Sequence, residues 1–585
     1  DKTTVFAEGL LIPTGVLPHG RGAFVSDDTT ILFLEDTDGD GRADRREVVL
    51  SGFGTEDSHH KAHSLRWSPD GRVHMNLGVF LHNNMETAHG LASRSGYWLA
   101  GIMAYHPPSG KLSTHLANSV PPNPWGHYWN RWGLDFHIDS SGQQGSNFIL
   151  PTDGGTSSAV PVPGGEGKLA GAEVVSGRHF PEDWQGSLVS APFKENRLVR
   201  WTFSDDSSGY AMKAAGPLIV STNSAFRPVD HHMGPDGALY VADWFNPLIG
   251  HMQHHFRDTG RDMTQGRIWR VTAKGRPLVE RPQIAGASVK QLLNHLKAPE
   301  DYTRAQARRA LAERGPRAVM PTLASWVRKL DVSDPNYDHH RMEALWVDQN
   351  LNRTEPGLLR SVLRAADPNA RAAATAVLRD WHGAMPDALH LLAAQVADEH
   401  PRVRLQAVIA LSYIPTRRSM ELAAAALERP TDRYIEQALR NTANALKPHW
   451  EPHLAAGEML FDGNPVKLEF VTQAAGSVPG ARVLVRLLNG GKVEPSRRAK
   501  VLGTIASVGG EQELKALFEH AFENEFQARV LSELARAARD RKIIPKTDFQ
   551  RLKTHLNSSH EPLRIAALQL AGAWKAGDLR AYIAS

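Results

Sequence analysis

The chain has 585 residues, a formal net charge of +4 at pH 7 and no cysteine. This length exceeds what one hydrophobic core usually fills, so we expect two or more domains. The lack of cysteine excludes disulfides, cysteine-ligated zinc, iron–sulfur clusters and covalent haem attached through CxxCH. No apolar run approaches the ~20 residues of a membrane span, so we expect no transmembrane segment.

The composition changes near residue 277. Acidic residues outnumber basic ones in 1–277, whereas basic residues prevail in 278–585. We predict a β-propeller over 1–277, a linker over 278–287 and HEAT-like helical repeats over 288–585. The chain opens at Asp1 in strand-like sequence without a methionine start, which predicts a processed or incomplete N-terminus.

The first half shows short β-branched and aromatic runs separated by Gly, Pro and Asp, a pattern typical of all-β folds. One hairpin unit recurs, as Ser68-Pro69-Asp70-Gly71 and Gly234-Pro235-Asp236-Gly237, each followed by a strand. Repetition of such a unit favours radially arranged sheets. We predict about five visible blades, with a further piece before Asp1 able to complete the ring.

The segment 36–47 fits the calcium-loop pattern D-x-D-x-D-G-x5-E without mismatch. Ca²⁺ takes six to eight oxygen ligands, and carboxylates at alternating loop positions converge on one point. The flanks read as strands, so we predict an EF-hand-like loop with a structural role. The alternative is a solvated acidic turn. The predicted calcium-binding residues are Asp36, Asp38, Asp40, Arg42 (through its carbonyl), Asp44 and Glu47.

Histidine clusters precede two predicted strands. His60 and His63 lie in the first, and His231 follows Asp230 in the second. Imidazole serves as a metal ligand or as a general base near neutral pH. Residues that enter the innermost strand of a propeller blade line the central channel, so we expect these groups to converge on one funnel. Hydrogen bonding within loops is the alternative for each histidine.

Arginine and aspartate pairs stand beside aromatic residues in predicted loops. They include Arg227 with Asp230, and Arg257 with Asp258, followed by Arg261. Such pairs suit an anionic or polyhydroxylated ligand. Ion pairs that pin long loops are the alternative.

From Ser288 onward, amphipathic helical periods replace the strand pattern. A proline followed by a polar residue and an Ala/Leu-rich helix recurs, at prolines 368, 401, 430, 465, 495 and 562. The first five of these prolines lie 29 to 35 residues apart, and the last gap of 67 residues is close to two such periods. This spacing predicts two-helix repeats of the HEAT type. Solenoids mostly bind other proteins, and we expect the basic solenoid to dock a protein partner rather than nucleic acid.

The chain resembles the "membrane-bound dehydrogenase" proteins of Planctomycetes, Verrucomicrobia and Bacteroidetes. The resemblance spans nearly the whole chain and depends on 34–41, Gly52-Phe53-Gly54, 123–127, 226–230, 234–237, Ala242-Asp243-Trp244 and 266–270. These proteins join HEAT repeats to a propeller that is similar to soluble sugar dehydrogenases dependent on pyrroloquinoline quinone. Many also carry a c-type haem module, which this chain lacks.

The resemblance implies an extracytoplasmic, periplasmic-type oxidoreductase that acts on a sugar or related alcohol. Pyrroloquinoline quinone and Ca²⁺ would be its cofactors, and a separate cytochrome would accept electrons. His60 or His63 would take the hydroxyl proton, with Arg227 and Asp230 also at the catalytic centre. The cofactor-binding residues would be His231, Arg257, Asp258 and Arg261.

Two other functions remain open. A non-catalytic scaffold or binding subunit of a larger assembly is favoured by the missing haem module and by the dispersed candidate residues. A polysaccharide lyase or hydrolase is less favoured because no pair of carboxylates stands out in the sequence.

Overall fold

A computed structural model describes residues 3–87, 90–95, 100–116, 123–140, 145–153, 155–165, 167–192, 194–249, 258–262, 264–522 and 526–579. The chain divides into two compact units, 1–410 and 411–585. The first unit holds the propeller together with the first helices, and the second is entirely helical.

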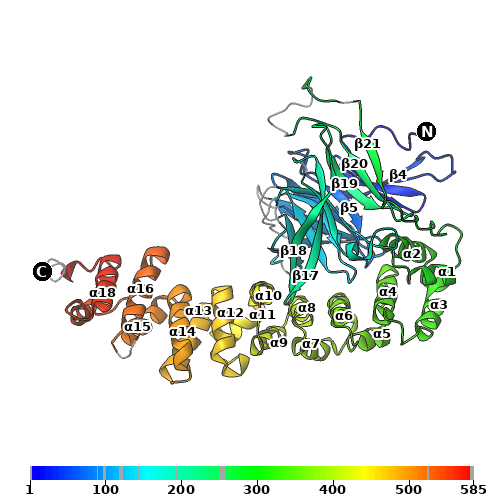
Figure 1. Cartoon of the computed structure of the whole chain (residues 1–585). Helices are drawn as coiled ribbons and strands as arrows, with labels where there is room; N and C mark the ends of the chain where they lie inside the picture. Colours follow the sequence, from blue (N-terminus) through cyan, green and yellow to red (C-terminus); the bar gives the residue numbers. More distant parts are fainter. Residues whose placement is uncertain are drawn as a thin grey trace. The chain divides into compact units, whose positions relative to one another are not determined.

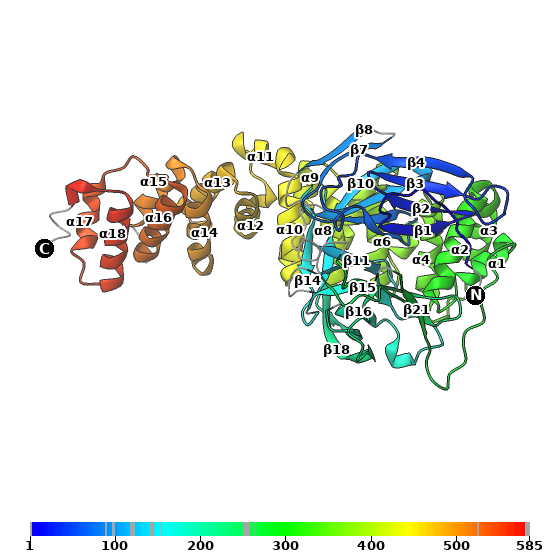
Figure 2. The same ribbon diagram turned by 90° about the horizontal axis from the view of Figure 1, so that it is seen from above.

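The described part of the N-terminal half forms five antiparallel sheets, which are the five blades of a β-propeller (Figures 1 and 2). Blade 1 contains β1 (Gly15–His19), β2 (Gly22–Asp27), β3 (Thr30–Glu35), β4 (Arg45–Ser51), β7 (His82–Thr87) and β8 (Gly90–Ser95). Blade 2 contains β5 (His63–Trp67), β6 (Val73–Leu77), β9 (Gly101–His106) and β10 (Lys111–Leu116). Blade 3 contains β11 (Pro124–Trp129), β12 (Asp135–Asp139), β13 (Ser146–Leu150) and β14 (Ser158–Pro161). Blade 4 contains β15 (Leu169–Val174), β16 (Leu188–Pro192), β17 (Arg197–Asp206) and β18 (Gly209–Val220). Blade 5 contains β19 (Pro228–Met233), β20 (Leu239–Asp243) and β21 (Arg267–Val271).

The recurring Pro-Asp-Gly unit forms the same tight turn in blades 2 and 5. In each turn the glycine, Gly71 or Gly237, has a positive φ (84° and 78°) that other residues rarely adopt. Each glycine also donates its N–H to the carbonyl three residues earlier, on Ser68 and Gly234. The turn prediction is therefore confirmed by conformation and by hydrogen bonding.

Neighbouring inner strands contact one another in the order β1, β5, β11, β15 and β19. Glycines permit this close approach near the axis. A Cβ on Gly126 would lie 3.2 Å from the Cβ of Ala172, and one on Gly171 would lie 2.8 Å from Cε1 of His231. Any larger side chain would push the blades apart.

The helices of the first unit are α1 (Val289–His295), α2 (Asp301–Arg314), α3 (Pro316–Arg328), α4 (Tyr337–Asn350), α5 (Pro356–Val362), α6 (Pro368–Trp381), α7 (Ala388–Val396) and α8 (Pro401–Ser412). Those of the second unit are α9 (Arg417–Ala424), α10 (Arg433–Ala445), α11 (Lys447–Ala455), α12 (Pro465–Ala475), α13 (Val478–Asn489), α14 (Pro495–Val508), α15 (Glu511–His520), α16 (Gln527–Arg541), α17 (Lys553–Leu556) and α18 (Glu561–Ala573). Of the helices in the described ranges, none has the length and apolar character of a membrane span.

Proline begins several of these helices as the repeat pattern predicts. Pro368, Pro401, Pro465 and Pro495 are the first residues of α6, α8, α12 and α14, where a missing N–H costs no helical hydrogen bond. The helices form two layers, because α2, α4 and α6 contact in succession, as do α10, α12, α14, α16 and α18. This is the arrangement of an α-solenoid.

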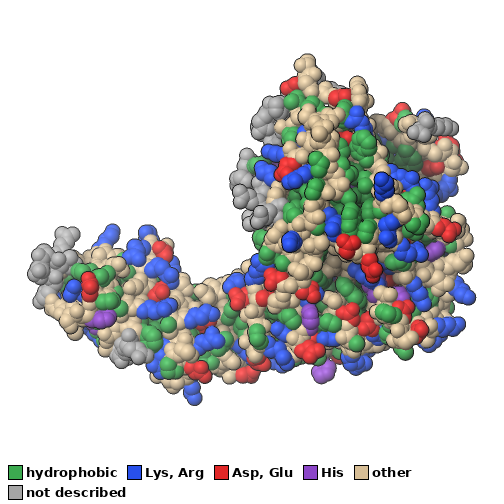
Figure 3. All heavy atoms as spheres, viewed as in Figure 1, with side chains coloured by type: hydrophobic (Ala, Val, Ile, Leu, Met, Phe, Trp, Pro, Cys, Tyr) green, Lys and Arg blue, Asp and Glu red, His purple; other side chains and the backbone are tan. Residues whose placement is uncertain are grey.

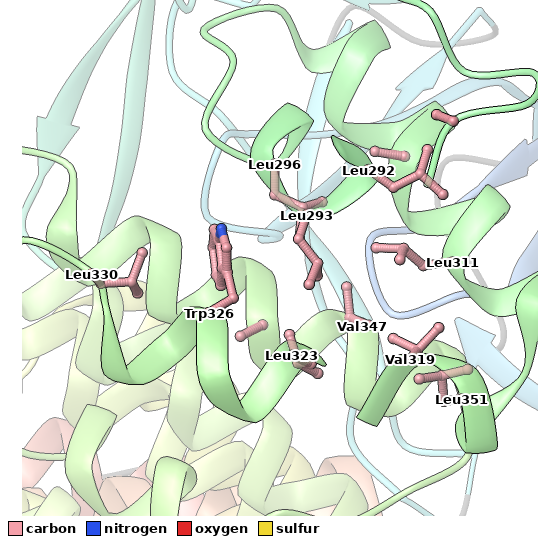
Figure 4. Close-up of a cluster of buried hydrophobic side chains, with 13 residues drawn as sticks. Leu292, Leu293, Leu296, Leu311, Val319, Leu323, Trp326, Leu330, Val347 and Leu351 are labelled. Carbon is pink, nitrogen blue, oxygen red and sulfur yellow. The ribbon is translucent and has the colours of Figure 1, made fainter. Parts of the chain in front are cut away.

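Apolar residues fill the space between the layers. In the first repeats Leu292, Leu311, Leu323 and Val347 are at most 2% exposed and face one another (Figure 4). Trp326 lies at the edge of the cluster and is 8% exposed.

Over the face drawn in Figure 3, basic and acidic side chains of α9–α18 intermix rather than separate into patches.

The helix layer that contains α2, α4 and α6 packs on the propeller. Glu300, immediately before α2, accepts hydrogen bonds from the Arg178 guanidinium at 2.8 and 3.1 Å. Asn350, at the end of α4, donates to the carbonyl of Pro69 at 2.8 Å. Asp380 on α6 pairs with Arg72 at 2.9 Å. These contacts fix the helices to the side of the propeller where each inner strand connects to the second strand of its blade. The compact unit therefore includes the first helices and extends to Ala410.

Candidate functional site

His60 and His63 both lie where the chain enters the inner strand β5. The Nδ1 of His60 is 2.9 Å from the carbonyl of Val79, and its Nε2 is hydrogen-bonded to Oδ1 of Asn123, which precedes β11. Both ring nitrogens of His60 therefore already have partners. His63 is 8% exposed.

The two nitrogens of His63 differ. Its Nδ1 is 3.0 Å from the hydroxyl of Ser64, whereas its buried Nε2 has no hydrogen-bond partner among the described residues. Burial, aided by His60, lowers the pKa of His63 to about 3, so the ring is neutral at neutral pH. The ring of Trp125 lies 5.7 Å away.

Four charged side chains from three blades meet around the axis, and we call them the axial quartet: Arg66 of β5, Glu173 of β15, and Asp230 and His232 of β19. The guanidinium of Arg66 lies 3.2 Å from Glu173 and 3.6 Å from Asp230. The imidazole of His232 lies between the same two carboxylates, with Nδ1 3.4 Å from Glu173 and Nε2 3.1 Å from Asp230. Each cation thus bridges both anions.

The electrostatics of the quartet follow from this alternation. Burial and Arg66 lower the pKa of His232, but Asp230 and Glu173 outweigh them and raise it to about 9. The pKa of Asp230 stays below its ordinary value because His232 and Arg66 outweigh the effect of burial. At neutral pH the quartet therefore holds two positive and two negative charges. The side chains of Asp230 and His232 are still 50% and 54% exposed, so water reaches them.

The other predicted site residues of blade 5 do not join the quartet. Arg227 is 3% exposed, and its guanidinium donates to the carbonyls of Asn246 and Ser224 at 3.2 and 3.0 Å. His231 is 1% exposed, and its Nε2 lies 2.7 Å from the carbonyl of Val189 on β16. Both side chains hold strands and loops together.

The loop that follows β20 contains the remaining cofactor candidates. Asp258 accepts a hydrogen bond from the N–H of Gly260 at 2.9 Å, and the Arg261 guanidinium lies 5.7 Å from the centre of the Trp244 ring. Arg257 lies outside the described residues. Neither Asp258 nor Arg261 has a described contact with the axial quartet.

The predicted calcium loop connects β3 and β4, strands rather than helices, as expected. The carboxylates of Asp36, Asp38 and Asp40 lie within 4.8 Å of one another. Asp36 accepts the N–H groups of Gly39 and Gly41 at 2.5 and 3.0 Å, so backbone hydrogen bonds shape the loop. Three oxygen donors at one point fit a hard cation.

The rest of the predicted loop is arranged differently. Asp44 accepts hydrogen bonds from Thr37, and Glu47 lies in β4 and pairs with Arg45 at 2.8 Å. Neither belongs to the gathered carboxylate group. Arg42 donates its N–H to Asp40 at 2.7 Å.

A second group of titratable residues lies between blades 2 and 3. His74, His115, His127 and Asp135 bring one ligand atom each within 4.8 Å of the others. They come from β6, β10, β11 and β12. The sequence pattern gave no sign of this group, because its members belong to four strands. His127 and Trp129 lie two residues apart on β11, and Trp129 stands opposite Asp135 on β12. This pattern is the signal that would have indicated two of the four members, His127 and Asp135.

The comparisons with known proteins found matches in both halves of the chain. A family model described as a domain of unknown function (DUF7133) matches residues 1–163 and 162–275, and a HEAT-repeat model matches 356–443. No curated protein sequence matches the chain. The chain is similar to solved structures of a luciferin-regenerating enzyme (15% identity, TM-score 0.32, 46% of this chain and 81% of that one) and of a glucose dehydrogenase (18%, 0.29, 46% and 85%). A second glucose dehydrogenase structure is similar at 17% identity and TM-score 0.28 over the same shares of the two chains.

Proposed function

We propose that this chain is a binding subunit, in which the propeller holds a small hydroxyl-bearing ligand, such as a sugar, and the helical repeats dock a protein partner. One observation carries the proposal: the axial quartet places two carboxylates and two cations around the axis and leaves Asp230 and His232 about half exposed. Carboxylates, guanidinium and imidazolium groups are the hydrogen-bonding partners that sugar hydroxyls require.

The hydrogen bonding of His60, a predicted catalytic residue, and the charge of His232 favour binding over catalysis. His60 uses both ring nitrogens in hydrogen bonds to the protein. His232 carries a proton at neutral pH because its pKa is raised to about 9, so it is a donor rather than a general base. A quartet with balanced charge binds a neutral ligand without leaving an unpaired charge.

The helical repeats support the partner-docking part of the proposal. HEAT repeats often mediate protein interactions, and a HEAT-repeat model matches 356–443. An extracytoplasmic location fits the absence of cysteine. Fractionation of cells that produce the protein tests the location directly.

Calorimetric titration with a panel of mono- and oligosaccharides tests the ligand. We expect saturable binding to the unmodified protein, and loss of most affinity in Asp230→Asn, which keeps the shape but removes one charge. Asp183→Asn, on an exposed turn of blade 4, is the matched control. Absence of binding to every sugar, or equal binding by Asp230→Asn, would refute the proposal.

A quinone-dependent dehydrogenase is the second candidate, and the unpartnered Nε2 of His63 favours it. The described residues do not fit the cofactor well, however. Arg227, expected at the catalytic centre, is buried and donates to two carbonyls. Dye reduction with added quinone, Ca²⁺ and sugars tests this candidate, with a cytochrome as alternative acceptor. Turnover that disappears in His63→Gln would support it, and failure to bind the quinone would exclude it.

A further inference from the structure

We infer that His74, His115, His127 and Asp135 form a binding site for one Zn²⁺-type transition-metal ion between blades 2 and 3. The site differs from the predicted calcium loop in location, in ligand chemistry and in burial. It is independent of the proposed sugar binding.

Strand register brings the blade 3 ligands to one face. His127 stands opposite His137, and Trp129 stands opposite Asp135, in the antiparallel pair β11–β12. Because side chains two residues apart share a face of a strand, His127 and Asp135 point to the same side of the sheet. The Nε2 of His127 is 3.7 Å from a carboxylate oxygen of Asp135. Two ligands thus arise from one hairpin.

Blade 2 supplies the other two ligands. The ring of His74 on β6 lies 4.8 Å from that of His127 and 4.6 Å from that of His115. His115 is an irregular residue of β10, because the β10–β9 register shifts between Thr114 and Leu116. A bulge of this kind redirects one side chain out of the regular alternation. It turns His115 toward Asp135, with which its Nε2 is paired.

The buried nitrogens of this group lack partners. His127 is 0% exposed, and neither of its ring nitrogens has a hydrogen bond within the described ranges. Nδ1 of His74, which is 2% exposed, is likewise unpartnered. Leaving a buried polar group without a hydrogen bond is unfavourable. A coordinated metal ion would satisfy one nitrogen of each ring.

Ligand type selects the class of metal. Three imidazoles and one carboxylate suit Zn²⁺ and related divalent transition metals, whereas Ca²⁺ and Mg²⁺ prefer all-oxygen sites. Four protein ligands complete the tetrahedral shell of a structural zinc site. A pocket of about 60 Å³ is lined by His74, His115 and Asp135, together with Trp129 and Trp346. The metal would lock blade 2 to blade 3.

Metal content and binding of the whole protein test the inference. The protein is chelated, dialysed and reloaded with Zn²⁺ in an excess of Ca²⁺, which is added to compete with Zn²⁺ for the acidic loop. We expect about one equivalent of zinc by elemental analysis. His115→Ala changes the least buried ligand and should weaken Zn²⁺ binding more than about tenfold. His82→Ala, an exposed histidine paired with Glu56, should bind as the unmodified protein does.

Cobalt substitution provides a readout that needs no variant. Co²⁺ in a tetrahedral imidazole and carboxylate site should give visible absorption bands that added Zn²⁺ abolishes. Zinc retention well below one equivalent, unchanged affinity in His115→Ala, or a cobalt spectrum identical to that of the aqueous ion would each overturn the inference. The cluster would then be a metal-free group of paired side chains.

Discussion

Arg402 of α8 and Asp205 of β17 form an ion pair with a nitrogen–oxygen distance of 2.7 Å. The arginine side chain is 2% exposed although that of Asp205 is 72% exposed. The guanidinium also donates to the carbonyls of Ser208 and Gly209, and lies 4.2 Å from the centre of the Tyr210 ring. One helical side chain thus holds the end of the longest hairpin of blade 4.

Arg402→Met should destabilise the first unit by about 2–4 kcal/mol, because two buried carbonyls and a carboxylate lose their donor. Arg402→Lys should restore little of the stability lost in Arg402→Met, since an ammonium lacks the planar fork of the guanidinium. Thermal and denaturant unfolding measure both. Arg418→Met, at a site 63% exposed, is the control, and equal loss in both Met variants would contradict the expectation.

Asp348→Asn should stabilise the protein above pH 7. Asp348 is 1% exposed with an unpartnered Oδ1, and burial, followed by Glu355, raises its pKa to about 7 against the effect of Arg353. A folded pKa above the unfolded value of ~3.9 means that stability falls as pH rises from about 4 through 7. The variant should gain on the order of 2 kcal/mol at pH 8 and little at pH 4. Denaturant unfolding of both proteins between pH 4 and pH 8 tests this prediction. An equal gain in stability at pH 4 and at pH 8 would refute it.

His232→Gln should lower the melting temperature more at pH 6 than at pH 10. The folded pKa of His232, about 9, lies above its unfolded value of ~6.5. The imidazolium therefore contributes its full stability below pH ~6.5, and loses it as pH rises through 9. Melting curves at both pH values test this. The same loss at each pH would show that packing, not charge, explains the effect.

Ca²⁺ should raise the melting temperature, and Asp38→Asn should abolish the rise. Asp36, Asp38 and Asp40 bring their carboxylates together at an exposed loop, where repulsion is relieved by a bound cation. Scanning calorimetry with Ca²⁺, Mg²⁺ and chelator measures the effect, with Asp183→Asn as the control. A melting temperature indifferent to Ca²⁺ would contradict the calcium-loop prediction.

Gly171→Ala should lower the free energy of unfolding more than Gly476→Ala does. Both glycines have similar φ values, 64° and 61°, so backbone strain is matched. A Cβ on Gly171 would lie 2.8 Å from the His231 ring, whereas nothing lies within 4 Å of one on Gly476. The difference in unfolding free energy should be about 1–3 kcal/mol. Equal losses would mean that the blades adjust freely near the axis.

Local patterns in the sequence predicted the repeats well. Pro-Asp-Gly specified the turns at Gly71 and Gly237, since few residues tolerate their positive φ, and proline marked the start of α6 and α12. The axial quartet was not predictable as a group, because Arg66, Glu173 and His232 come from three blades far apart in sequence. His115 was also missed, since a single shift of register turns its side chain and no composition signal accompanies such a shift.

The packing of the even-numbered helices on the propeller has an evolutionary consequence. Arg178 with Glu300, Asn350 with Pro69 and Arg402 with Asp205 each link a blade to a different helix. A residue inserted or deleted between α2 and α8 would move later contacts away from their blades. Homologous chains should therefore keep constant spacing over this stretch, and substitutions at the paired positions should co-vary.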